Sequence, residues 1–312
     1  MTAAAVGLSH SPLIGKNDPD ADVLARVEEA VANARAFIRD FDPELVVLYA
    51  PDHYNGFFYH EMPPFCLATE AHAVGDFGSA AGPLSVDTAA AKALAQGVLD
   101  RGVDLTISAR MTVDHGFAQP LEVLFGGIDR VPVVPVFVNG VATPLCPVRR
   151  VRALGTAIGE VASELDKRVL FLGSGGLSHD PPVPVLDGAP PRVADALIEG
   201  RPPTPEQRAK GEQRVIQAGR DYVAGDTKMT PINPTWDNRL LDIVEQGELA
   251  EFDSWRVEWM AAEGGGSAHE ARTWIAAFAS LAATGPYELR SRFYEAIPAW
   301  IAGFAVATAL GR

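Results

Sequence analysis

Four of the seven histidines directly follow short apolar runs that have the composition of buried strands. They are His10, His53, His115 and His179. The carboxyl ends of parallel strands meet at one edge of an open α/β sheet, so these imidazoles should converge there. Neutral imidazole binds transition metals, and its pKa of about 6.5 also suits proton transfer. A lone histidine is more often a hydrogen-bonded structural residue, but four in equivalent places predict that at least three share a site.

A carboxylate would complete such a site, because two histidines and one carboxylate hold iron(II) while leaving coordination positions open. The sequence offers Glu270, from the later half of the chain. Ser267 and Glu270 also form an S-x-x-E pattern, in which the glutamate would bond the backbone at a helix start instead. The sequence leaves both roles of Glu270 open.

Aspartates stand directly before two of these histidines, at Asp52 and Asp114. A carboxylate commonly accepts the second ring N–H of a metal-binding histidine, so either residue is a candidate for orienting an imidazole or its loop. Solvated loop aspartates would give the same pattern. The histidines without a preceding strand are expected at the surface or behind the site, and they are His60, His72 and His269.

Two further sequence patterns argue against phosphate binding and serine-hydrolase chemistry. Residues 173–176 are rich in glycine but lack a following Lys-Ser/Thr and the G-x-G-x-x-G spacing, which argues against a phosphate-binding loop. Neither Ser9 nor Ser174 stands in G-x-S-x-G, which argues against a serine hydrolase. Several aromatic residues could wall a flat apolar ligand or anchor their loop in the core. They are Phe57, Phe58, Tyr59 and Phe65.

The chain up to residue 184 alternates strand and helix patterns, which predicts an α/β fold with a mostly parallel or mixed central sheet flanked by helices. The predicted strands are 3–8, 45–50, 105–108, 131–138 and 168–172. The predicted helices begin at Asp18 and run to Phe41, and then cover 87–99 and 148–165. Residues 51–84 are predicted to be a long loop that lines a site. Pro132 and Pro135 favour an edge position or a bulge for their strand.

The chain after residue 184 is predicted to be rich in helix. An exposed connection at 187–205 precedes helical patterns at 206–223, 236–246, 249–262 and 267–283. Because no long linker is evident, we expect one catalytic domain over 1–312, with an α/β core at about 1–184 and a helical part at about 185–312. A two-domain split is the alternative.

Composition restricts the partners. The 312 residues carry 40 acidic and 26 basic side chains, and the net charge of −14 disfavours nucleic acid or an anionic membrane as partner. The two cysteines, Cys66 and Cys146, form no disulfide framework or zinc motif and fit a reducing cytoplasm. The first residues lack the pattern of a signal peptide, and the apolar run at 300–310 is too short to cross a bilayer.

Several long sequence motifs resemble those of the class III extradiol ring-cleavage dioxygenases. These motifs are L-S-H-S-P at 8–12, A-P-D-H-Y-N-G-F-F at 50–58, D-F-G-S-A-A-G at 76–82, V-D-H-G-F-A-Q-P at 113–120 and L-G-S-G-G-L-S-H at 172–179. The likeness continues through N-P-T-W-D-N at 233–238 and I-P-A-W-I-A-G-F at 297–304, and so covers nearly the whole chain.

The resemblance implies Fe²⁺ held by His10, His53 and Glu270, with His115 and His179 as catalytic residues. We expect His179 to act as the base and His115 as the acid. The implied reaction is extradiol cleavage of a 3-substituted catechol by O₂, for example 3-(2,3-dihydroxyphenyl)propionate or 2,3-dihydroxycinnamate, to a 2-hydroxy-6-oxo-dienedioate in aromatic catabolism. A homo-oligomer, often a tetramer, is also implied.

The side-chain carboxylate of such a substrate should meet an arginine, a lysine or backbone amides, because an unpaired buried charge is costly. Two other classes of protein stay open. The first is a zinc-dependent hydrolase or ring-opening enzyme on the same scaffold, which oxygen consumption and reactivation by Fe²⁺ would distinguish. The second is a non-enzymatic binding protein without metal.

Overall fold

The computed structural model describes residues 3–200, 203–226 and 228–312. Its centre is an eight-stranded mixed sheet with the strand order β10-β11-β1-β9-β2-β8-β3-β6. In that order the strands are Tyr287–Ile297, Ala302–Gly311, Ala3–Leu8, Val169–Ser174, Leu45–Ala50, Val133–Val138, Phe65–Ala68 and Thr106–Ser108. A second sheet of three short strands, β5-β4-β7, comprises Ala81–Pro83, Ala71–Val74 and Met111–Val113.

The four central strands are parallel and buried on both faces. β1 pairs with β9, β9 with β2, and β2 with β8, all in parallel. Alternate side chains of β2 enter opposite cores: Val46 and Leu48 pack on one face, Val47 and Tyr49 on the other. Two-sided burial explains why these strands are continuous apolar runs in the sequence.

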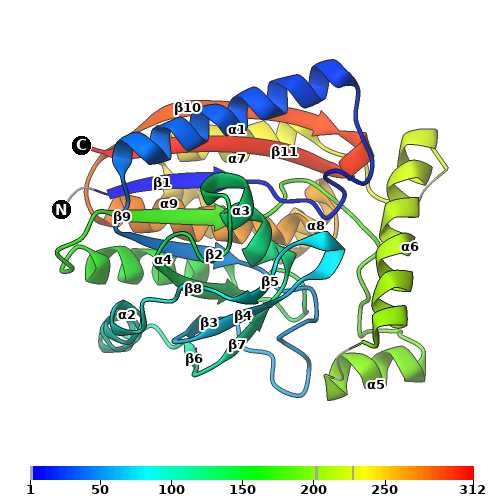
Figure 1. The fold of residues 1–312 in the computed structure, drawn as a ribbon, viewed down its shortest axis with the longest axis horizontal. Coiled ribbons are helices and arrows are strands. Elements are labelled where there is room, and N and C mark those ends of the chain that lie inside the picture. The colour runs from blue at the N-terminus through cyan, green and yellow to red at the C-terminus, as the bar shows by residue number, and fades with distance from the viewer. Residues whose placement is uncertain (1–2, 201–202, 227) are drawn as a thin grey trace.

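Helices cover both faces of the sheet (Figure 1). α1 (Ala21–Phe41) and α3 (His115–Phe125) pack on one face, while α2 (Thr88–Asp100), α4 (Val148–Ala162) and α9 (Arg272–Ala283) pack on the other. The predicted α/β class is therefore confirmed. The expected helices of the C-terminal half are present as α6 (Pro205–Ala224), α7 (Pro234–Gln246), α8 (Val257–Gly264) and α9.

The C-terminal half also supplies two strands that were not predicted. β10 and β11 form a long antiparallel pair, and β11 lies beside β1 inside the main sheet. Its side chains are small or apolar because both of its faces are covered; Phe304 and Ala305, for example, enter opposite cores. The apolar run at 300–310, which was predicted only to be too short to cross a bilayer, therefore contributes most of the interior strand β11.

The expectation of an edge position or a bulge for β8 is wrong, since β8 lies between β2 and β3. The reason lies in the direction of its hydrogen-bonding groups. Val133 exchanges backbone bonds with Ser85 and Asp87 on the side away from β2, and Pro135 shares that side because backbone groups alternate along a strand. β3 pairs only with Val136–Val138, so the missing N–H of Pro135 breaks no ladder bond.

Smaller differences concern element boundaries. α1 starts after Asp20 rather than at Asp18. The expected loop at 51–84 contains β3, β4, β5 and the short helix η1 (Asp76–Gly78). A helix α5 (Pro191–Glu199) lies in the expected exposed connection, and the pattern at 249–262 splits into η2 (Leu249–Ser254) and α8.

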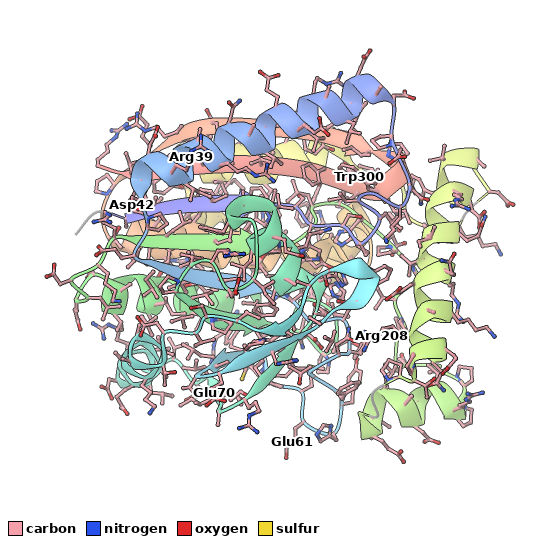
Figure 2. All side chains as sticks on the ribbon, viewed as in Figure 1. Arg39, Asp42, Glu61, Glu70, Arg208 and Trp300 are labelled. Atoms are coloured by element: carbon pink, nitrogen blue, oxygen red, sulfur yellow. The ribbon has the colours of Figure 1, made fainter. Side chains whose placement is uncertain are left out.

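Helix α6 stands along the end of the sheet toward which the parallel strands β1, β9 and β2 point (Figure 1). Figure 2 shows Arg208 on this helix, close to the loop that follows β2. The Arg208 guanidinium donates a hydrogen bond to Asn55 Oδ1 at 3.2 Å. The described part of the chain has no helix that is both long and apolar enough to cross a membrane.

The close approach of β1 to α9 predicts a sensitive glycine. A Cβ at Gly7 would lie 2.2 Å from the Trp274 ring, which is fully buried and fixed by a 2.9 Å hydrogen bond from Nε1 to Gly175 O. We expect Gly7→Ala to lower the free energy of unfolding by about 1–3 kcal/mol or more, because an overpacked core must distort. Thermal and denaturant unfolding would measure the loss.

Gly211→Ala on α6 is the matched control. Its new methyl would meet no atom within 4 Å, and alanine favours helix over glycine. We expect this variant to be neutral or slightly stabilised. Equal stability of the Gly7→Ala protein and the unchanged protein would contradict the tight β1–α9 packing.

Candidate active site

Three histidines surround the carboxylate of Glu270. The Nε2 atom of His10 lies 3.3 Å from Oε2, while Nε2 of His53 lies 3.0 Å and Nε2 of His179 lies 3.1 Å from Oε1. His115 adjoins them, with its ring 4.6 Å from that of His53 between centroids. The structure therefore brings all five predicted site residues together.

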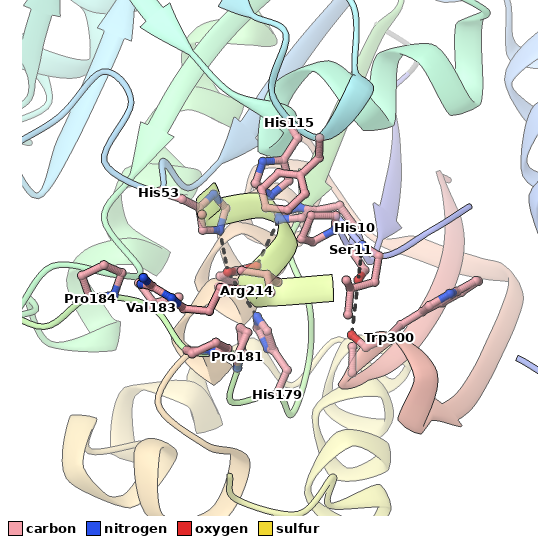
Figure 3. A pocket seen from close by; sticks show the side chains of 18 residues that line it. His10, Ser11, His53, His115, His179, Pro181, Val183, Pro184, Arg214 and Trp300 are labelled. Atoms are coloured by element: carbon pink, nitrogen blue, oxygen red, sulfur yellow. Dashed lines mark hydrogen bonds and ion pairs between the residues drawn. The ribbon is translucent and has the colours of Figure 1, made fainter. Parts of the chain in front are cut away.

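The outer ring nitrogen of each imidazole has its own partner. Nδ1 of His10 meets Ser174 Oγ at 2.9 Å, Nδ1 of His53 meets Asp114 at 3.0 Å, and Nδ1 of His179 meets a backbone carbonyl at 2.9 Å. Nδ1 of His115 meets Asp76. These contacts hold the rings so that the Nε2 atoms of His10, His53 and His179 point toward Glu270; the dashed lines in Figure 3 mark these contacts. Metal-binding histidines are commonly held in this way.

Strand ends deliver most of these side chains. His10, His53 and His179 follow β1, β2 and β9, which are neighbours in the sheet. His115 arrives differently, as the first residue of α3 after β7 of the small sheet. The sequence predicted convergence at a single sheet edge, and the fourth imidazole reaches that edge from a helix start.

Glu270 lies in the short helix η3 (Ala268–Ala271) just before α9. The capping box suggested by S-x-x-E is not formed, because the Ser267 side chain makes no cap hydrogen bond. The Glu270 carboxylate instead accepts a 3.0 Å bond from Gly176 N and faces the imidazoles. The capping alternative for Glu270 is therefore wrong.

Electrostatics suit this cluster to a cation. Burial would raise the pKa of the Glu270 carboxyl, but the charge of His179 and hydrogen bonds from His179 and His53 hold that pKa well below its usual value. Burial lowers the pKa of His10 to about 3, which leaves a neutral ring able to bind metal.

The other three imidazoles of the site have raised pKa values. Burial disfavours their charged forms, but Asp114 raises the pKa of His53 well above its usual value, Asp76 raises that of His115, and Glu270 raises that of His179. A divalent cation would compete with these protons for the same nitrogen and oxygen atoms. Ligand atoms of His10, His53 and His115 lie within 4.8 Å of one another, and the Glu270 carboxylate lies 3.3 Å from His10 and 3.0 Å from His53. The cluster thus offers three imidazoles and one carboxylate, donors that suit a transition metal.

The cluster forms the floor of a cavity of about 200 Å³. Its walls are mostly apolar, and the side chains of Figure 3 surround it. The wall residues come from the loop after β1, from η1, from the segment after His179, from α6 and from the turn before β11: Pro12, Leu13, Phe77, Pro181, Pro182, Val183, Pro184, Gly211, Arg214, Val215, Trp300 and Ala302.

The aromatic residues proposed from sequence as a pocket wall have other places. Phe57 stacks on Phe137 at 3.8 Å between ring centroids, Phe58 is buried, and Phe65 lies in β3. The alternative reading, in which they anchor the loop in the core, holds for these three. Phe77 forms the aromatic part of the wall.

Asp114 and Asp52 take one each of the two expected roles, orienting an imidazole and orienting its loop. Asp114 orients His53, as described above, whereas Asp52 accepts backbone bonds from Asn55, Gly56 and Phe57 and so shapes the loop. Burial and the nearby Asp114 raise the pKa of Asp52 to about 7. His60 and His72 are exposed, as expected for surface residues, and His269 is buried.

Sequence reasoning missed three contributors to the site. Asp76 stands in the D-F-G word but was given no role, and Ser174 was considered only as a nucleophile. Asp237 gave no signal, although its buried carboxylate accepts bonds from Ser178 N and Oγ at 2.7 Å each. The turn that carries His179 is further joined to β11, because Gly303 N donates to Ser178 O at 2.9 Å.

Taken together, fold and site define an α/β protein with a buried cluster that could hold a metal ion at the carboxyl edge of its sheet. The chain matches the family described as the catalytic LigB subunit of aromatic ring-opening dioxygenase over residues 4–305. It belongs to that family, and the resemblance inferred from the sequence is confirmed. The protein is accordingly an extradiol catechol dioxygenase, which excludes a non-enzymatic binding protein.

Close relatives carry a common name. The chain is 55% identical over 310 residues to a 2,3-dihydroxyphenylpropionate/2,3-dihydroxicinnamic acid 1,2-dioxygenase of Rhodococcus jostii, with 99% of each chain covered. An enzyme of the same name from Mycolicibacterium paratuberculosis is 53% identical over 309 residues, with 99% of each chain covered. The corresponding 1,2-dioxygenase 1 of Pseudomonas putida is 56% identical over 299 residues, with 95% of each chain covered.

The contact between Asp114 and His53 predicts a measurable change. Asp114→Asn removes the negative charge that raises the pKa of His53, so that pKa should fall in the variant. NMR titration of the metal-free protein would follow the imidazole resonance. Asp76→Asn is the matched control, because Asp76 partners His115 and its loss should lower the pKa of His115 more than that of His53. An unchanged His53 pKa in Asp114→Asn would contradict the assigned contact.

Proposed function

We propose that this protein is an Fe²⁺-dependent dioxygenase that opens 3-(2,3-dihydroxyphenyl)propionate or 2,3-dihydroxycinnamate beside its diol. Both atoms of O₂ enter the product, a 2-hydroxy-6-oxo-dienedioate, in aromatic catabolism. The observation that carries the proposal is the Glu270 carboxylate shared by three Nε2 atoms at 3.0–3.3 Å. The names of the relatives support the substrate.

His10, His53 and Glu270 would hold the iron. Each is oriented by an additional bond, to Ser174, to Asp114 and from Gly176 N respectively. Two imidazoles and one carboxylate leave coordination positions open, so these residues would hold a metal whose chemistry is the activation of the catechol and O₂ together.

His179 and His115 would move the protons. We assign His179 as the base, because it lines the cavity with its Nδ1 engaged by Leu177 O and its Nε2 3.1 Å from Glu270 Oε1; it would take a proton from a catechol hydroxyl. His115, backed by Asp76, would return a proton to oxygen as the O–O bond breaks. The apolar walls would hold the ring in place and exclude water.

We further propose that the chain forms one catalytic domain and assembles as a homo-oligomer, a tetramer by the resemblance, in the cytoplasm. The two cysteines are free, as expected in a reducing compartment. Static light scattering of purified protein would measure the assembly.

Removal and replacement of metal test the cofactor. Chelation should abolish oxygen uptake with 3-(2,3-dihydroxyphenyl)propionate, and anaerobic loading with Fe²⁺ should restore it, because the reaction needs a redox-active metal. Zn²⁺ is the control, since it binds similar ligands but does not change its redox state. Cleavage by the zinc-loaded protein without oxygen uptake would favour the zinc enzyme instead.

Alanine variants test the division of roles. His10→Ala and His53→Ala should lose bound iron, because each removes one of three proposed ligands. His179→Ala and His115→Ala should retain iron but lose turnover by about 10²–10⁴-fold, the usual contribution of a general acid or base. Metal analysis combined with oxygen uptake would separate the two groups. Loss of iron from both His115→Ala and His179→Ala would refute the assignment.

A further inference from the structure

One strongly basic side chain lines the cavity. Among the described residues that form its wall, Arg214 of α6 is the sole arginine or lysine. It is exposed, and it has no hydrogen bond or ion pair with any other residue in the described part of the chain. Figure 3 shows Arg214 among the side chains that surround the cavity.

The helix that carries Arg214 is fastened to the site on two sides. Glu212 accepts a 2.8 Å bond from Phe77 N, and Arg208 donates to Asn55 beside the His53 loop. Farther along, Asn17 Nδ2 donates to Ile216 O at 2.9 Å. These contacts on both sides of residue 214 fix the backbone, while its side chain stays unengaged.

The rest of the cavity makes a cation at this place significant. Its floor contains Glu270, with the carboxylates of Asp114 and Asp76 directly behind the imidazoles, and the net charge of the protein is −14. Along the mostly apolar wall, an anionic substituent would find no other guanidinium or ammonium group as partner. Arg214 offers a planar group of hydrogen-bond donors suited to a carboxylate.

We propose that Arg214 determines substrate specificity by binding the carboxylate of the 3-substituent. The catechol diol would lie at the histidine floor, the short carbon chain along the apolar wall formed by Val183 and its neighbouring prolines, and the carboxylate at α6. The inference rests on the proposed function and adds the residue that would select catechols whose side chain ends in an anion.

The test compares two ligands of equal size and different charge. 3-(2,3-Dihydroxyphenyl)propionate and its neutral amide would be assayed with the iron-loaded protein and with Arg214→Gln. We expect kcat/KM for the acid to fall roughly 10- to 100-fold, the range for loss of a charge-assisted hydrogen bond. The fall should lie in KM, since the contact is equal in ground and transition states. The amide should change less than about threefold.

Lys210→Gln is the matched control, because it removes the same charge from an exposed position on α6 that does not line the cavity. It should leave both substrates unchanged. An equal loss for acid and amide in Arg214→Gln would overturn the proposal by showing a structural role. An equal loss for the acid in both variants would overturn it by showing a general effect of charge.

Charge reversal gives a second measurement. Arg214→Glu should weaken the acid further and improve cleavage of 3-(3-aminopropyl)catechol relative to the unchanged protein; failure of this exchange would count against direct contact. Anaerobic calorimetric titration with the acid and the amide measures binding without turnover. If the unchanged protein cleaved no catechol, the proposed function would fail, and selective loss of acid binding in Arg214→Gln would still decide the role of Arg214.

Discussion

A single buried carboxylate holds the catalytic centre together. Removal of the Glu270 charge from water is costly unless opposite charges and hydrogen-bond donors replace the solvent, and the structure supplies imidazoles from three neighbouring strand ends together with the Gly176 amide. Without Glu270, His53 and His179 would lose a negative charge that raises their pKa values. Without the imidazoles, burial would raise the pKa of the Glu270 carboxyl. Each part of the cluster thus influences the protonation of the others.

The sheet makes this arrangement possible. β1, β9 and β2 are adjacent and parallel, so the residues that follow them emerge side by side. Gly7 and Gly173 let α9 approach these strands so closely that a Cβ at either position would collide with residues 273–274. That approach places the start of α9, and with it Glu270, opposite the strand ends. The geometry of the catalytic centre thus depends on small residues in the core.

The sequence was most informative where chemistry and local pattern coincide. His10, His53 and His179 follow apolar strands whose parallel pairing could be inferred, so their convergence was predictable. Glu270 was ambiguous because a capping box and a carboxylate ligand share one pattern, and only tertiary contacts separate the two. The role of Asp237 could not be predicted, because it depends on a tertiary contact with Ser178 that no local sequence pattern indicates. The predicted edge position of β8 was wrong because a proline disrupts a sheet only where the neighbouring strand needs its N–H. Whether the side of β8 that Pro135 faces is paired at that point cannot be read from the sequence.

The pairing of β1 with β11 has a consequence for how the enzyme is made. β1 lies between β9 and β11, and the turn carrying His179 bridges to Ala302. One of the two neighbours of β1 is therefore very distant in the sequence, with Ala4 opposite Leu310. Contacts between such distant parts of a chain form slowly, because a long loop must close first. Until β11 is in place, the edge of β1 that it covers would expose unpaired backbone groups, and such an edge can pair with other chains.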